Sequence, residues 1–140
     1  MKNNGKIQTI FINLPVKDIE KTRRFWSELG FGFQEQFSND KALCLVLNEG
    51  AIYAMLMSKD YFGTFTHRPI AEGDTTQVLL AIKVDSRDRV NEIVTAALEQ
   101  GATRYMEPSD LGWMYYDRFA DPDGHQWEVM CADETLIPKE

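Results

Sequence analysis

Side chains able to do chemistry are concentrated near the C-terminus, where residues 121–128 have the sequence Asp-Pro-Asp-Gly-His-Gln-Trp-Glu. Pro122 and Gly124 predict a tight turn, because proline presets φ and glycine adopts a positive φ without steric cost. Asp123 is able to cap this turn with its own side chain. The polar–apolar alternation that follows predicts a strand with Glu128 on the face opposite its apolar neighbours. Glu128 on this face is therefore a candidate general base.

The other polar side chains that we considered offer no complete catalytic set. Asp117 and Arg118 precede the turn, and either residue could pair with Glu128 or repel it. His125 lies in the turn, on the opposite strand parity to Glu128, and we expect it to hydrogen-bond the turn. We expect His67 to be a surface or flap residue.

The sequence DPDGHxWE near the end of a chain of 140 residues resembles the closing segment of the vicinal-oxygen-chelate (VOC) superfamily, the glyoxalase/bleomycin-resistance/extradiol-dioxygenase group. The resemblance covers residues 7–131. It implies an α+β fold, in which two βαβββ modules form a curved half-barrel with the helices on the convex side. It also implies that Glu128 stands where the family usually has its last metal ligand.

The other ligand positions that this resemblance implies hold side chains poorly suited to a hard metal. The first-strand positions fall on Phe11 and Leu79, and the position in the last strand of the first module falls on Tyr53 or Met55. A divalent metal site generally needs roughly three or four protein ligands, of which only Glu128 remains. We therefore predict no bound metal and no cofactor, which removes the Lewis acid of glyoxalase I and extradiol-dioxygenase chemistry.

The elements that must position Glu128 repeat one pattern. In each half, a strand leads through an N-cap, Asp18 or Ser86, into an amphipathic helix that ends near Gly30 or Gly101. Three strands follow each helix, which gives the order βαβββ twice. The predicted strands are residues 7–14, 31–37, 42–47 and 52–57 in the first half, and 77–84, 103–106, 113–119 and 126–130 in the second.

The repeated order βαβββ predicts a first module at residues 7–58 and a second at 77–132. Together they are expected to form one VOC domain at 7–132. The connection at 59–76 is long for a compact domain and rich in aromatic residues. Two interpretations remain open for it: a linker whose aromatic side chains pack on the outside, or a flap over the ligand site.

The concave side of the half-barrel is the predicted ligand site, a cup lined by apolar, aromatic and methionine side chains. A carboxylate in such surroundings is costly to ionise, so Glu128 must find a partner, stay in contact with water or serve function. The alternative is that these side chains simply fill the core. In that case Trp113 and Tyr115, which are predicted at the mouth of the cup, would pack on a helix or a second subunit. The predicted ligand-binding residues are Phe11, Asn13, Tyr53, Met55, Leu79, Trp113, Tyr115 and Glu128.

Composition limits the partners. A net charge of −7 argues against nucleic acid and anionic membrane surfaces, and no apolar run approaches the roughly 20 residues of a membrane helix. The first residues lack the apolar stretch of a signal peptide, so we expect a cytoplasmic protein. Cys44 and Cys131 are expected to be buried free thiols. Curved sheets leave edges to be covered, and superfamily members of this size usually pair, so we expect a homodimer.

Two functions follow from these features. The first is a glyoxalase/bleomycin-resistance-like protein that binds a small, partly apolar organic molecule without a metal. The second is a glyoxalase- or dioxygenase-related enzyme, of lyase or isomerase type, that uses Glu128 as general base or a non-standard metal site. The loss of metal ligands favours the first.

Overall fold

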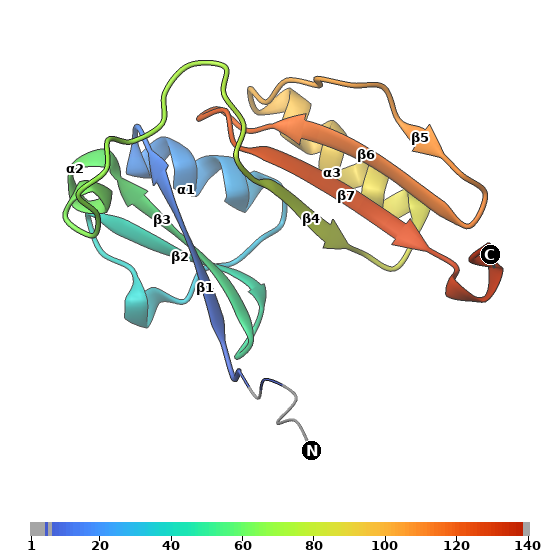
Figure 1. The fold of residues 1–140 in the computed structure, drawn as a ribbon, viewed down its shortest axis with the longest axis horizontal. Helices are drawn as coiled ribbons and strands as arrows, with labels where there is room; N and C mark the ends of the chain where they lie inside the picture. The colour runs from blue at the N-terminus through green and yellow to red at the C-terminus, as the bar shows by residue number, and fades with distance from the viewer. Residues whose placement is uncertain (1–4, 6, 139–140) are drawn as a thin grey trace. The chain divides into compact units, whose positions relative to one another are not determined.

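The computed structural model describes residue 5 and residues 7–138. The chain forms two compact units, and the boundary between them along the chain lies between Ala71 and Glu72 (Figure 1). Each unit has its own sheet and at least one helix, which confirms the predicted α+β class. No helix in the described part of the chain is long and apolar enough to cross a membrane.

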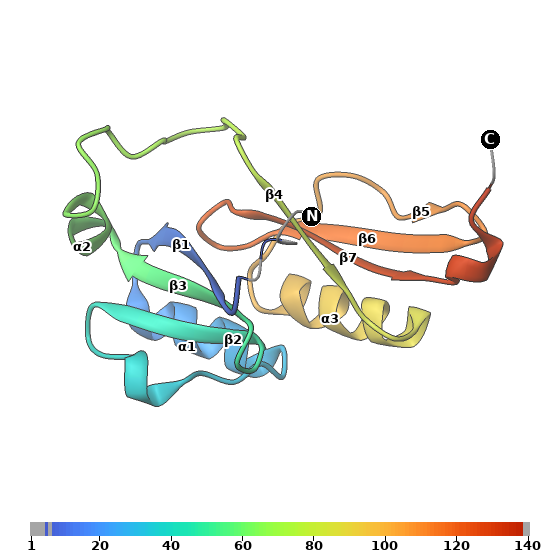
Figure 2. The same ribbon diagram turned by 60° about the horizontal axis from the view of Figure 1, so that its bottom comes forward.

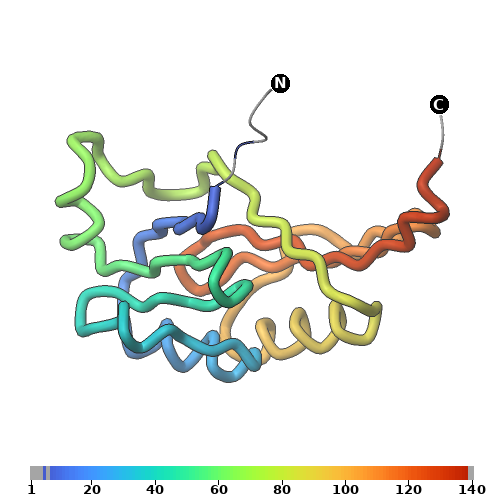
Figure 3. Tube along the Cα trace, turned by 90° about the horizontal axis from the view of Figure 1, so that it is seen from below, coloured from blue at the N-terminus to red at the C-terminus, as the bar shows by residue number. Residues whose placement is uncertain are grey.

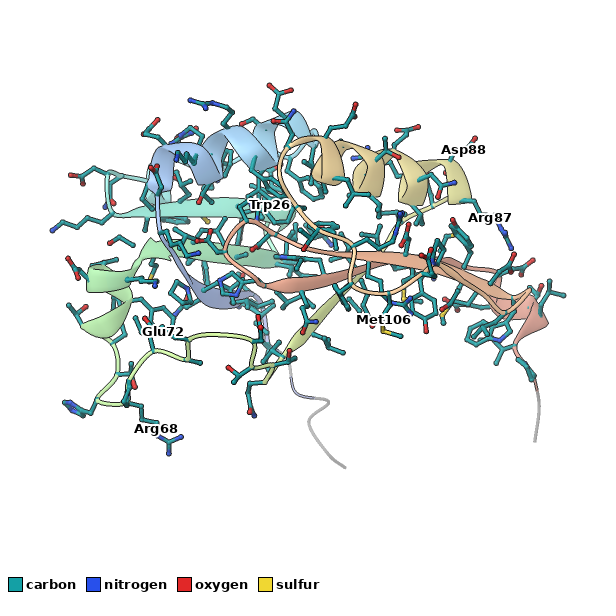
Figure 4. The ribbon with its side chains drawn as sticks, turned by 90° about the horizontal axis from the view of Figure 1, so that it is seen from above. Trp26, Arg68, Glu72, Arg87, Asp88 and Met106 are labelled. Carbon is teal, nitrogen blue, oxygen red and sulfur yellow. The ribbon has the colours of Figure 1, made fainter. Side chains whose placement is uncertain are left out.

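The first unit is a three-stranded sheet in the order β1-β3-β2 with α1 on one face, as Figure 2 shows. Its β1 and β3 are parallel, and β2 and β3 are antiparallel. Asp18 caps α1, as predicted, by accepting a hydrogen bond from the Lys21 N–H at 3.0 Å. Trp26 points from α1 toward the sheet and is 1% exposed (Figure 4). The elements are β1 (Ile10–Val16), α1 (Ile19–Glu28), β2 (Ala42–Asn48), β3 (Ile52–Ser58) and α2 (Lys59–Gly63).

The strand predicted at residues 31–37 is wrong. Only Phe33 forms a β-bridge, to Leu45, and the chain then enters a 3₁₀ turn at Glu35–Phe37. The hydroxyl of Ser38 accepts a hydrogen bond from the Cys44 N–H at 3.0 Å, so a side chain takes the place of the backbone partner that a continuing strand would supply.

The second unit is a four-stranded sheet in the order β4-β7-β6-β5, with α3 on one face (Figure 3). Parallel pairing joins β4 to β7, and β6 is antiparallel to both β7 and β5. Ser86 caps α3 as predicted, accepting a hydrogen bond from the Arg89 N–H at 3.0 Å. The elements are β4 (Leu79–Lys83), α3 (Arg87–Glu99), β5 (Ser109–Asp110), β6 (Met114–Ala120) and β7 (Gln126–Ala132).

The strand predicted at residues 103–106 is also wrong, since only Thr103 bridges to Ala120, and the edge strand forms instead at β5. Between these points the chain carries Pro108, which has no N–H to donate to a ladder. The carbonyl of Glu107 accepts a hydrogen bond from the Arg118 side chain. The segment is therefore held by a side chain and not by a continuous strand.

The connection between the modules was predicted at residues 59–76, and it begins with a short helix, α2. Ser58 caps this helix by accepting a hydrogen bond from the Tyr61 N–H at 3.3 Å, and the Tyr61 and Phe65 rings pack edge to face at 5.0 Å. Residues 66–78 contain no helix or strand.

Strand alternation separates the two faces of the second sheet. Trp127 and Val129 are fully buried on the face that contacts α3, so Glu128 between them points to the other side. Figure 4 shows Met106 on that side too, away from α3. We call this side the site face. By register, its strand residues are Leu79, Ala81, Lys83, Met114, Tyr116, Arg118, Ala120, Gln126, Glu128, Met130 and Ala132.

Candidate functional site

The turn that leads into β7 is built around Asp121, a residue whose role the sequence argument did not single out. Its Oδ1 accepts hydrogen bonds from the backbone N–H groups of Asp123 (2.9 Å) and His125 (3.0 Å), and its Oδ2 accepts one from Trp127 Nε1 (3.1 Å). Burial raises the pKa of Asp121, while the nearby His125 and the bond from Trp127 act in the opposite direction. Gly124 has φ 88°, as the turn requires.

This turn sets the register that presents Glu128. Across the hairpin Glu128 lies directly opposite Arg118, and on its other side it lies beside Ala81 of β4. The Glu128 side chain is half-buried, and the predicted orientation opposite Trp127 and Val129 is confirmed.

Arg118 is 3% exposed and is fixed in place from several directions. Its Nη1 donates to the carbonyl of Glu107 and its Nη2 to the Ser109 hydroxyl at 3.1 Å. The guanidinium also lies over the Tyr116 ring, 4.4 Å from its centroid. Its Nε is buried and has no hydrogen-bond partner. Arg118 therefore brings to the site face a rigid positive charge with one donor unused.

Tyr105 adds a second unused polar group to the same region. Its hydroxyl is buried and has no hydrogen-bond partner. Burial raises the pKa of Tyr105, and the negative charge of Glu128 raises it further, while Arg118 opposes the shift. The hydroxyl is therefore protonated at neutral pH and lies within electrostatic range of both Glu128 and Arg118. Arg118 and Glu128, which are paired in register, are the centre of the candidate site, and their charges act on Tyr105.

Asp117, the other charged residue considered beside the turn, points away from this centre. It is 2% exposed and accepts hydrogen bonds from Arg104 Nε (3.2 Å), Arg104 Nη2 (2.5 Å) and the Arg118 backbone N–H (2.8 Å). Of the two candidates, Arg118 is thus the neighbour of Glu128, while Asp117 holds Arg104.

Four of the predicted site residues lie in the first unit, on the face of its sheet away from α1. Phe11 is paired in register with Tyr53, and their rings stack with centroids 5.3 Å apart. Asn13 pairs with Met55 in the same ladder. Phe11 is 47% exposed, whereas Tyr53 is 6% exposed and its hydroxyl accepts a hydrogen bond from the Gly50 N–H at 2.7 Å.

The remaining predicted residues of the second unit divide between its two faces. Leu79 shares the site face with Glu128. Tyr115 lies on the opposite face, where its hydroxyl donates to Asn91 Oδ1 of α3 at 2.8 Å and Arg87 lies over its ring. Trp113 and Tyr115 line a separate cavity of about 210 Å³ beside Arg87 and Asp133. The structure therefore places Tyr115 against the helix, the alternative that the sequence left open.

The side chains around Glu128 do not fit the divalent metal that the family resemblance implies. Its neighbours on β4, Leu79 and Ala81, carry no donor atom, and Arg118 contributes a positive charge that opposes a second cation. Within residues 5 and 7–138, no group of three or more His, Cys, Asp or Glu is arranged to hold a metal ion. Among the histidines, His67 is exposed, and the backbone of His125 forms part of the turn.

Comparison with known proteins places the chain in a family. The chain is similar to the structure of hypothetical protein SA1046 from S. aureus, with 25% identity over 91% of this chain and 96% of that one, at a TM-score of 0.77. A glyoxalase/bleomycin resistance protein/dioxygenase family enzyme from Burkholderia phytofirmans PsJN shares the fold at 19% identity, 87% and 96% coverage and a TM-score of 0.74. A glyoxalase-related enzyme from Fulvimarina pelagi shares it at 21% identity, 89% and 87% coverage and a TM-score of 0.72.

No match was found among curated proteins. The model of the Glyoxalase/Bleomycin resistance protein/Dioxygenase superfamily matches residues 8–129, which is most of the chain. The sequence motif, the two-sheet architecture and this match agree, and the chain belongs to the glyoxalase/bleomycin resistance protein/dioxygenase superfamily.

Proposed function

We propose that this protein binds a small, partly apolar organic molecule on the site face around Glu128, without the help of a metal ion. One observation carries the proposal: a half-buried carboxylate stands on this face between an apolar strand and the buried cation of Arg118. Sites for organic ligands combine apolar area with a few fixed polar groups. Around Glu128, this face offers Leu79, Ala81 and Met130 as the apolar part and Arg118 as the fixed polar group.

The apolar part of the site comes from β4 and β7. Leu79 is 52% exposed, and Ala81 and Met130 belong to the same face. Exposed apolar side chains gain free energy when a ligand covers them, and methionine adapts to irregular shapes. The polar part is preorganised, because Arg118 is held by Glu107, Ser109 and Tyr116 before any ligand arrives.

The first unit supports binding of planar molecules on its own account. The Phe11 ring is stacked on Tyr53, with one side packed and 47% of the residue exposed, and Asn13 adds a polar group on the same strand. An aromatic surface of this kind favours ligands that stack.

The test is a small-molecule screen that measures melting temperature, applied to protein purified without chelator. The proposal predicts compounds that raise the melting temperature of the parent and do so less in Glu128→Gln, together with far less than one equivalent of metal by elemental analysis. About one equivalent of Zn, Ni, Fe or Mn in the parent, lost in Glu128→Gln, would show that Glu128 is a metal ligand and would overturn the proposal.

A further inference from the structure

We propose that a cavity beside the start of α3 binds a small organic cation, an ammonium group carried on a few carbon atoms. The cavity has a volume of about 210 Å³ and belongs to the second unit. Neither Glu128 nor its register partners Arg118 and Ala81 line it, so the inference concerns a second site. The lining residues that matter for binding are Asp85, Arg87, Trp113, Tyr115, Cys131 and Asp133.

Backbone hydrogen bonds join the segments that surround the cavity. The Asp133 N–H donates to the Trp113 carbonyl at 2.7 Å, which ties the end of β7 to the start of β6. The Val84 N–H donates to the Met130 carbonyl at 2.7 Å, which ties the segment before α3 to β7. The cavity is therefore formed before a ligand arrives, and binding does not have to order a loop.

The charges around the cavity favour a cation. Arg87 is already neutralised, because its Nη1 and Nη2 donate to the two carboxylate oxygens of Asp110 at 2.8 and 2.9 Å. Within residues 5 and 7–138, neither Asp85 nor Asp133 forms an ion pair. An anion would have to displace Asp110 from Arg87 and approach these two carboxylates, whereas a cation is attracted by both.

Trp113 supplies an aromatic wall. The residue is half-buried, and in the described part of the chain no other ring and no cation packs on its indole. Tyr115 differs, because the Arg87 guanidinium already lies over its ring, 4.8 Å from the centroid. Tryptophan is the aromatic residue that attracts a cation most strongly. An indole without a cation, in a cavity with two carboxylates, therefore suits an ammonium group.

The volume and the side chains limit the kind of cation. Pockets for drug-sized molecules are roughly 300–1,000 Å³, so a cavity of about 210 Å³ suits a ligand of few heavy atoms. A metal ion is the other class of small cation. The described residues hold no group of three or more His, Cys, Asp or Glu arranged to bind one, although Asp85, Cys131 and Asp133 all line this cavity. An organic cation remains.

Three compounds of similar shape test the charge of the ligand: choline, its uncharged analogue 3,3-dimethylbutan-1-ol, and the anion 3,3-dimethylbutanoate. Each titration is followed by the indole N–H signals of the three tryptophans in ¹H–¹⁵N spectra. Trp26 and Trp127 are 1% and 0% exposed, so only the signal of Trp113 should move. We expect choline to bind at least about fivefold more tightly than either other compound, the scale of a cation–π contact.

Two variants of equal charge test whether the cavity itself is responsible. Asp85 is exposed, and its side chain has no partner among the described residues, so Asp85→Asn should leave the fold intact. Choline should bind about threefold or more weakly to this variant. Asp88→Asn is the matched control, because Asp88 is also exposed near the start of α3 and does not line the cavity (Figure 4). Its affinity for choline should stay close to that of the parent.

The thiol of Cys131 gives a second readout, which Trp113→Leu requires because this variant loses the indole signal. Cys131 lines the cavity, whereas Cys44 is fully buried. Choline should slow the alkylation of Cys131 by uncharged iodoacetamide, as measured by mass spectrometry. In Trp113→Leu the same protection should require at least about threefold more choline.

Equal affinity for choline and its uncharged analogue would show that the cavity recognises apolar volume alone and would overturn the inference. Tighter binding of the anion would overturn it too, because Arg87 would then decide recognition. So would a Trp113 signal that about 50 mM choline does not move, well above the millimolar affinity expected of so small a ligand. Equal weakening in Asp85→Asn and Asp88→Asn would show only a diffuse attraction and contradict a site. None of these outcomes bears on Glu128, whose test uses other residues and other compounds.

Discussion

At the scale of single residues, the site is distinguished by polar groups that the fold buries without satisfying. Native proteins leave few such groups, and each one that persists needs an explanation, such as a functional role or a bound water. Here the two in the described chain, Tyr105 Oη and Arg118 Nε, lie in the same part of the second unit as Glu128. A buried hydroxyl without a partner does not stabilise the fold, so its removal should not lower the free energy of unfolding.

Replacing Tyr105 with Phe should leave the free energy of unfolding unchanged or raise it by up to about 1 kcal/mol, because the variant no longer buries an unpaired hydroxyl. The matched change, Tyr115→Phe, removes a hydrogen bond to Asn91 and should lower stability by about 1 kcal/mol. Urea unfolding of both variants beside the parent gives the comparison. A loss in Tyr105→Phe as large as that in Tyr115→Phe would show that the Tyr105 hydroxyl has a structural partner.

Asp117, in contrast, is a buried carboxylate whose two oxygens both accept hydrogen bonds. Asp117→Asn should lower the free energy of unfolding by about 2–3 kcal/mol, because it weakens the bonds from Arg104 and leaves that cation without its counter-charge. The measurement is again urea unfolding at pH 7. A variant within about 0.5 kcal/mol of the parent would contradict a structural role for this pair.

Strand alternation after the turn was enough to predict the face on which Glu128 lies. It would also have placed Tyr115 on the other face, because antiparallel pairing across the turn puts Tyr115 opposite Cys131, whose parity differs from that of Glu128. The burial of the Tyr105 hydroxyl and of Arg118 Nε was not predictable, because it depends on residues 104–108, which form no strand and are held to β6 by the Arg118 side chain.

At the scale of elements, the hairpin of β6 and β7 depends on the hydrogen bonds of Asp121. Asp121→Ala should lower the free energy of unfolding by about 3 kcal/mol, since it leaves two backbone N–H groups and Trp127 Nε1 without their acceptor. Pro122→Ala changes the same turn at an exposed position, makes no such loss and should cost less than about 1 kcal/mol. Equal losses in the two variants, by thermal or urea unfolding, would mean that proline and not the carboxylate organises the turn.

A second contact ties the start of α3, where Figure 4 shows Arg87, to β5. Arg87 Nη1 and Nη2 donate to the two carboxylate oxygens of Asp110 at 2.8 and 2.9 Å, and together with the Gly112 N–H they lower the pKa of Asp110 to about 2. A lowered folded-state pKa means that the stabilisation is present above the ordinary pKa of 3.8 and is lost as the pH falls through about 2.

The difference in unfolding free energy between the parent and Asp110→Asn should therefore be constant from pH 7 to about pH 5 and should shrink between about pH 4 and pH 2. It should also shrink at high salt, because the pair is exposed. Urea unfolding at several pH values measures it. A difference that grows as the pH falls would show that the carboxylate is not stabilised by Arg87.

The two long helices were predictable, since Asp18 and Ser86 supply caps and the apolar spacing indicates their buried faces. The strands at 31–37 and 103–106 were not. In the first, the Ser38 hydroxyl takes the backbone donor of Cys44, and in the second, the Arg118 side chain takes the carbonyl of Glu107. Both hydrogen bonds join residues that are separated in the sequence, and the strand propensity of a local segment does not predict such bonds.

At the scale of the whole molecule, each sheet ends in a strand that pairs on one side only within its own unit. In the described chain, β1 pairs only with β3 and β4 only with β7, and Ile10 and Leu79 on these strands are more than half exposed. Exposed apolar edge strands favour association. We expect a homodimer by sedimentation at micromolar concentration, and a monomer under those conditions would contradict this expectation.

The measurement that most directly tests metal-free binding around Glu128 is the ligand-induced rise in melting temperature, recorded with a compound from the screen in the presence of EDTA. The account predicts the same rise with and without the chelator in the parent, and a smaller or absent rise in Glu128→Gln. A rise that EDTA abolishes and that an added divalent cation restores would contradict it.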